Sequence, residues 1–96
     1  MLYIAFVKAR SQPAEGTKVE ELSRRWWNEG ARPAGLRTVA IFGSLGTSSP
    51  DVFVFDASSN DDIQTMVTFW SPVAEIDVHP CVDLAAAFRT QGMNVA

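Results

Sequence analysis

Apolar side chains recur along the chain in two patterns, one typical of strands and one typical of helices. Short segments rich in apolar β-forming residues and bounded by turn formers predict strands at residues 2–7, 36–42, 52–57 and 74–81. Segments with apolar side chains three and four positions apart predict helices at about residues 17–30, 58–72 and 83–89. No repeat, charge run or linker interrupts this order, so we expect one domain over residues 1–96.

Polar motifs beside the apolar stripes predict where the helices begin and end. Thr17 and Glu20 have the spacing of a capping box, so the first helix is expected to begin at Thr17 and to end near Gly30. The second helix is expected to begin in an acidic Ser/Asn-containing segment and to end at Pro72. Asp83 is expected to cap the short third helix.

The element order predicts an α+β fold of the ferredoxin-like type, β-α-β-β-α-β. Right-handed crossovers would place two helices on one face of an antiparallel sheet, with the first and third strands central and the others at the edges. The segments 2–7 and 52–57 carry apolar side chains on both faces, as expected for central strands. The fourth strand instead alternates, with Ile76 and Val78 on one face and Asp77 and His79 on the other.

Two helices can cover only one face of such a sheet, and the opposite face would leave large apolar side chains in water. We therefore expect a homodimer in which two copies pack sheet to sheet as a dimeric α+β barrel. The alternative is a monomer in which the C-terminal helix folds under the sheet.

Composition narrows the class of protein further. The net charge of −3 argues against nucleic-acid binding, which needs a basic surface. The single cysteine cannot form an internal disulfide or a thiolate zinc site, which favours a cytoplasmic protein. The apolar run at residues 2–7 is too short to cross a bilayer, so no membrane association is expected.

Several short strings resemble one protein family. They are MLYI at residues 1–4, GSLGT at 43–47, VFVFDA at 52–57, FWSP at 69–72 and IDVHP at 76–80. In their order they are similar to the DUF3303 family over roughly residues 1–90. The resemblance implies a dimeric α+β barrel of unknown function, and it carries over no catalytic residue. The architecture is also similar to that of polyketide cyclases, muconolactone isomerases, cofactor-free monooxygenases and small haem-binding oxygenases, which is an analogy of fold alone.

Asp77 and His79 are the candidate catalytic pair. Residues two apart on a strand project from the same face, where a carboxylate can orient an imidazole. His79 is the only histidine, so any general acid–base chemistry by imidazole must occur there. The alternative is a polar edge strand in which His79 makes a hydrogen bond or lies at a dimer contact. Cys81 follows on the same face and is expected to be a small packing residue, and the row from Glu75 to Cys81 is too long for one ion, so no metal is expected.

The large aromatic residues of the two long helices are candidates for a substrate-binding wall. Trp26, Trp27, Phe69 and Trp70 lie on or beside the apolar stripes, where core packing is the default. The functional alternative is that they line a pocket for a flat apolar ligand.

These patterns support two functions. The first is a small-molecule enzyme of the cofactor-independent cyclase, isomerase or oxygenase type, with no cofactor, acting on a flat hydrophobic substrate. The second is a non-catalytic module for ligand binding or dimerisation. A cavity beside His79 would favour the enzyme, whereas a cleft filled by Trp26 and Trp70 would favour the module.

Overall fold

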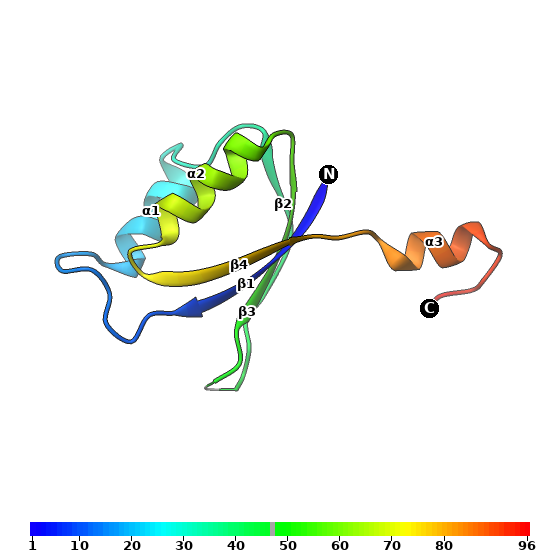
Figure 1. Ribbon diagram of the computed structural model, residues 1–96, viewed down its shortest axis with the longest axis horizontal. Coiled ribbons are helices and arrows are strands. Elements are labelled where there is room, and N and C mark those ends of the chain that lie inside the picture. Colours follow the sequence, from blue (N-terminus) through cyan, green and yellow to red (C-terminus); the bar gives the residue numbers. More distant parts are fainter. Residues whose placement is uncertain (47) are drawn as a thin grey trace.

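The computed structural model describes residues 1–46 and 48–96. Thr47, part of the loop predicted between the second and third strands, lies outside the described residues. Within these residues the chain forms four strands and three helices in the predicted order (Figure 1). They are β1 (Leu2–Ala9), α1 (Val19–Asn28), β2 (Leu36–Phe42), β3 (Asp51–Ala57), α2 (Asn60–Trp70), β4 (Ala74–Pro80) and α3 (Leu84–Thr90).

The strands form an antiparallel sheet in the order β2-β3-β1-β4. This confirms the α+β, ferredoxin-like prediction, with β1 and β3 central and β2 and β4 at the edges. Helices α1 and α2 lie together on one side of the sheet (Figure 1). We call that side the covered face and the opposite side the uncovered face.

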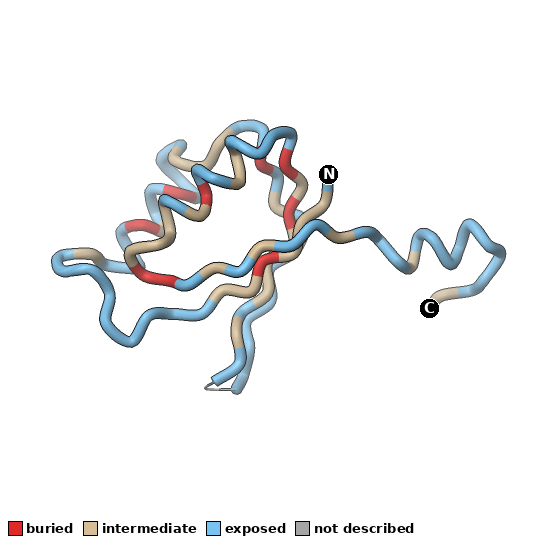
Figure 2. The backbone as a smooth tube through the Cα atoms, in the orientation of Figure 1, coloured by how far each residue is buried: buried red, intermediate tan, exposed pale blue. Residues whose placement is uncertain are grey.

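The strand register assigns side chains to these two faces, because residues directly opposite each other in neighbouring strands point the same way. Ala5 pairs with Phe53 on β3 and with Val78 on β4. Ala5 is only 1% exposed, so this row belongs to the covered face. Figure 2 shows the buried positions gathered where the helices and the sheet face each other. The next row, in which Phe6 pairs with Val52 and Asp77, belongs to the uncovered face.

A β-bulge in β2 changes which side chains meet each face. The register shifts between Thr38 and Ala40, and beyond the shift Ile41 pairs with Phe53 and Phe42 pairs with Val52. Ile41 therefore points to the covered side and Phe42 to the uncovered side.

The predicted capping box of α1 is wrong. Helix α1 begins at Val19, and its N-cap is Lys18, which makes no side-chain capping bond. The reason is a preceding turn, in which Gly16 has φ +77° and the backbone N–H of Thr17 donates to the carbonyl of Ala14 at 3.0 Å. Thr17 is thus held in the turn, one residue short of the N-cap.

The other predicted boundaries agree better with the structure. Ser59 accepts a hydrogen bond from the N–H of Asp62 at the start of α2, and Asp83 accepts one from the N–H of Ala86 at the start of α3. Gly30, with φ +81°, follows α1 as expected. Strand β4 ends at Pro80, one residue earlier than predicted.

An aromatic cluster holds α1 against α2. The Trp26 ring lies 5.1 Å from that of Phe69 and 5.7 Å from that of Trp70, and Phe69 and Trp70 are 5.2 Å apart, all measured between centroids. Trp26 is only 4% exposed and belongs to the main core with Leu36, Phe55 and Met66. The expected burial of Trp26 is confirmed.

Helix α3 does not fold under the sheet. Figure 1 shows it projecting beyond the end of β4, and none of its residues, all of which the structure describes, is buried. The uncovered face therefore stays open in this chain.

Asp56, on the uncovered face, holds an ion pair that the sequence reasoning missed. Its Oδ1 lies 2.7 Å from the terminal ammonium nitrogen of Met1, and its Oδ2 lies 3.6 Å from Nη2 of Arg37. The hydrogen bond from the ammonium group, its positive charge and then the charge of Arg37 lower the pKa of Asp56 from its ordinary 3.8.

Trp26→Ala should lower the free energy of unfolding by about 3–5 kcal/mol, because it removes a buried indole that joins the two helices. Trp27→Ala is the matched control: Trp27 is 44% exposed, so its removal should cost much less. Urea denaturation of both variants measures the difference. Equal losses of unfolding free energy in the two variants would show that Trp26 is not the principal contact between α1 and α2.

Asp56→Asn should destabilise the fold at neutral pH, with a difference that shrinks as the solution is acidified. A carboxyl whose pKa is lowered by folding contributes stability above its unfolded pKa and loses that contribution as the pH falls through the folded pKa. Denaturation of both proteins across the acid range measures this. A difference that stays constant down to a pH of about 2 would contradict the role of the charge.

Candidate ligand-binding site

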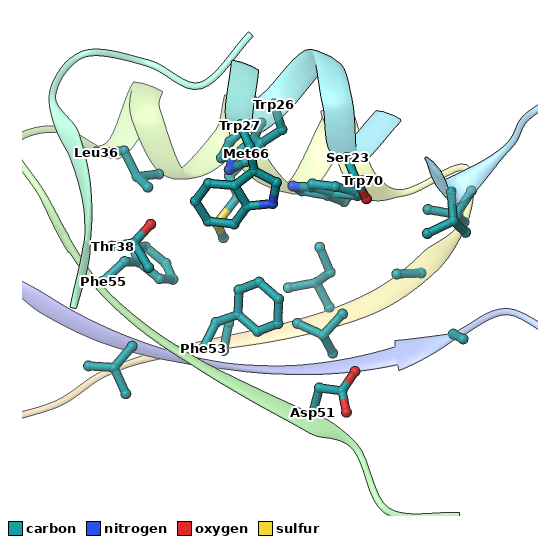
Figure 3. Close-up of a pocket in the computed structure, with 18 residues that line it drawn as sticks. Ser23, Trp26, Trp27, Leu36, Thr38, Asp51, Phe53, Phe55, Met66 and Trp70 are labelled. Carbon is teal, nitrogen blue, oxygen red and sulfur yellow. The ribbon is translucent and has the colours of Figure 1, made fainter. Parts of the chain in front are cut away.

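A cavity of about 210 Å³ lies between α1 and the covered face of the sheet (Figure 3). Trp26 and Trp27 of α1 and Trp70 of α2 form its helical wall, and Phe53 and Phe55 of β3 face them from the sheet. Its lining is mostly aromatic and aliphatic, as in binding sites for apolar small molecules.

Small side chains on the central and edge strands leave this space open. Ala5 and Ala9 of β1 and Ala74 of β4 line the cavity beneath the helices. The Trp26 indole of α1 packs against the rings of Phe69 and Trp70 of α2, so the contact that holds α1 in place comes from the neighbouring helix. Because alanine side chains are short, they occupy little of the space between the strands and the helices, and the cavity lies there.

Three polar side chains also line the cavity, namely Ser23 of α1, Thr38 of β2 and Asp51 at the start of β3. Asp51 is exposed and lies at the rim, where the backbone N–H of Ser44 donates to its Oδ1 at 2.9 Å. This hydrogen bond orients the carboxylate and leaves its second oxygen for another donor. Among the described residues, no buried side-chain nitrogen or oxygen lacks a hydrogen-bond partner, so none points unpaired into the cavity.

The structure places three of the four predicted wall residues at the cavity. Trp26, Trp27 and Trp70 line it, whereas Phe69 packs behind Trp26 and Trp70 and does not belong to the lining. The guanidinium of Arg25 lies 5.3 Å from the Phe69 ring centroid, a cation–π contact. Phe69 therefore supports the wall from behind.

Sequence reasoning missed Asp51 and the two phenylalanines of β3 as cavity residues. The available signal was the alternation along β3, which puts Asp51, Phe53 and Phe55 on one face. That signal alone does not say whether the face is filled or hollow.

The predicted pair of Asp77 and His79 is in contact. Nε2 of His79 lies 2.9 Å from Oδ2 of Asp77, and the two side chains are 52% and 73% exposed. The Phe6 ring meets the imidazole edge-on, with centroids 6.2 Å apart. A shallow depression lined by Phe6, Lys8, Glu75 and Asp77 opens beside the pair.

The sheet separates this pair from the cavity. Ile76 and Val7 are paired in the register and line the cavity, whereas Asp77 and His79 pair with Phe6 and Ile4 on the uncovered face. The tryptophans and the imidazole therefore cannot contact one small ligand within a single chain. Among the described residues, no group of three or more His, Cys, Asp and Glu side chains is placed to hold a metal ion.

The fold and cavity define an α+β domain of ferredoxin-like topology with an apolar pocket under its helices. A family model described as Domain of unknown function (DUF3303) matches residues 1–92, so the chain belongs to this family. Searches of curated proteins and of solved structures gave no significant match. Of the helices in the described residues, none has the length and hydropathy needed to cross a membrane.

Proposed function

We propose that this protein binds a small, flat, apolar ligand in the cavity between α1 and the sheet. The observation that carries the proposal is the cavity itself, which has an aromatic lining on two sides and a small set of polar groups at its rim. Core packing alone would favour larger residues at the alanine positions beneath α1, since protein interiors are close-packed.

The volume limits the ligand to one aromatic ring or a fused pair. An apolar cavity of roughly 150 Å³ accepts benzene, and drug-sized ligands occupy sites of about 300 Å³ or more. The value of about 210 Å³ falls between these two sizes.

Asp51 indicates which polar group such a ligand would carry. Its carboxylate accepts hydrogen bonds and bears a negative charge, so it favours a hydroxyl or an amine at the rim end of the ligand. An acidic ligand would be repelled.

Three matched probes test this proposal: naphthalene, 2-naphthalenemethanol and 2-naphthalenemethylamine. Each should shift the indole N–H signals of the three tryptophans in a ¹H–¹⁵N NMR titration, since all three line the cavity. Asp51→Asn keeps an acceptor for Ser44 and removes the charge. It should weaken the amine about two- to fivefold, as expected for an exposed ion pair, and leave naphthalene unchanged.

The probe series has two contrary outcomes. If no indole signal moves with any probe up to its solubility, the cavity does not bind this class of ligand. If Asp51→Asn weakens all three probes equally, the carboxylate has a structural effect and does not select the amine.

A second candidate function is acid–base catalysis by His79, of the cofactor-independent cyclase, isomerase or oxygenase type. The 2.9 Å contact from His79 to Asp77 favours it, because a carboxylate at that distance fixes the orientation of the imidazole. The substrate would bind on the uncovered face beside Phe6, outside the tryptophan cavity.

If turnover of an aromatic substrate is detected, His79→Ala and His79→Gln should both lower the rate by about 10²–10⁴-fold while thermal unfolding is unchanged. Asp77→Asn should lower it less, because the imidazole remains. Glu21→Gln is the control, since Glu21 is an exposed residue of α1, which lies on the other side of the sheet. Full activity in His79→Gln would exclude imidazole proton transfer.

A further inference from the structure

The cavity is closed at one end of β2 and open at the other. Leu36, the first residue of β2, lines the cavity and is only 2% exposed. Ile41, near the end of the strand, is 46% exposed although it points to the covered side of the sheet. The same change runs along β3, where Phe55 is buried and Asp51 is exposed. We call the end of the cavity beside Asp51 and Ile41 its mouth.

The packing of α1 explains why the mouth stays open. Leu22 and Trp26 are the buried residues of this helix, and they pack against the start of β4 and against α2. Val19 and Trp27 lie on the neighbouring side of the helix, where they line the cavity and are 47% and 44% exposed. The helix is thus held toward α2 and β4. Ile41 is on the opposite edge strand, where the helix leaves it in contact with water.

The mouth combines one charged group with an apolar surface. Asp51 and Phe53 are two residues apart on one face of β3, so their Cα atoms are about 7 Å apart. Ile41 pairs directly with Phe53 in the neighbouring strand, which places their Cβ atoms about 5 Å apart. Figure 3 shows the Phe53 ring pointing from the strand toward the tryptophans. A group bound at Asp51 therefore has Ile41 within the length of a short alkyl chain.

A ring inside the cavity does not cover Ile41, because Ile41 lies outside the lining. A ligand that continues past Asp51 with an apolar chain removes both that chain and the Ile41 side chain from water, which is favourable. A polar continuation keeps its own hydration and gains nothing from an isoleucine. The mouth therefore selects for an apolar substituent beyond the polar group.

We infer that the ligand of the cavity is a secondary amine or secondary alcohol with an aromatic ring on one side of the polar group and an alkyl chain on the other. The ring occupies the cavity, the N–H or O–H donates to Asp51, and the chain lies outside the mouth on Ile41. This inference rests on the proposed function and extends it, since the cavity alone accounts only for the ring.

Three N-substituted derivatives of 2-naphthalenemethylamine test the chain, namely the N-methyl, N-butyl and N-(3-hydroxypropyl) compounds. Each is titrated into the full chain while the indole N–H signals are followed by ¹H–¹⁵N NMR. The butyl compound should bind about five- to tenfold more tightly than the methyl compound, as expected for three further methylene groups that become half buried. The hydroxypropyl compound, which has the length of the butyl compound, should bind no more tightly than the methyl compound.

Two neighbouring residues of β2 provide matched variants. Ile41→Ser should reduce the butyl-to-methyl affinity ratio to about twofold or less, because the apolar contact is lost. Phe42→Ser should leave the ratio unchanged, since Phe42 is also exposed but the bulge points it to the uncovered face. The ratio is taken within each variant, so any general effect on the cavity cancels. Circular dichroism confirms that both variants are folded.

Intermolecular NOEs supply a measurement that needs no substitution. The terminal methyl group of the butyl chain should give NOEs to the methyl groups of Ile41 and none to the ring of Phe42.

The results separate this inference from the proposed function. If the methyl compound moves no indole signal, the cavity does not bind the ring, and both are wrong. If the methyl and butyl compounds bind equally, the ring binds but the inference about the chain is overturned. Equal ratios in Ile41→Ser and Phe42→Ser, or the absence of NOEs between the chain and Ile41, overturn it as well.

Discussion

The contact of Trp26 with Phe69 and Trp70 is the interaction on which the arrangement above the sheet depends. Trp26 is the buried aromatic anchor of α1, and its ring meets both aromatic side chains near the end of α2. Because this contact is with α2 and not with the sheet, α1 can lie above alanine residues of β1 and β4 while the space between them stays unfilled. The same contact thus stabilises the fold and leaves the cavity unfilled.

The two-residue period of β1 divides the molecule into two independent regions. Ala5 and Val7 face the cavity, and Ile4 and Phe6 face the open side, although all four are neighbours in sequence. A substitution at either set reaches only one region directly. The ferredoxin-like topology makes this division sharp, since both long helices lie on one face.

Much of the fold could be predicted from the sequence, because alternation and helical spacing are local signals. These signals predicted the four strands and the central position of β1 and β3 in the sheet. They also predicted that Ile76 and His79 point to opposite faces of β4. The start of α1 was misplaced because a turn closed by Gly16 competes for Thr17, and cap spacing alone cannot detect that competition. The cavity could not be predicted, since a hollow under α1 depends on how far the helix stands from Ala5 and Ala74 in three dimensions. For the same reason, the sequence predicted both Phe69 and Trp70 as wall residues, whereas only Trp70 lines the cavity.

The bulge in β2 determines which apolar side chains of this edge strand point to each face of the sheet. Without it, strict alternation from Leu36, which is buried under the helices, would put Phe42 on the covered side and Ile41 on the open side. The extra residue between Thr38 and Ala40 reverses both, so the larger, aromatic side chain joins Val52 and Phe6 on the uncovered face. That reversal extends the apolar surface of the central strands to the edge of the sheet. Phe42 is 62% exposed to water in the single chain, and an exposed aromatic side chain on an edge strand is a position where another apolar surface can pack.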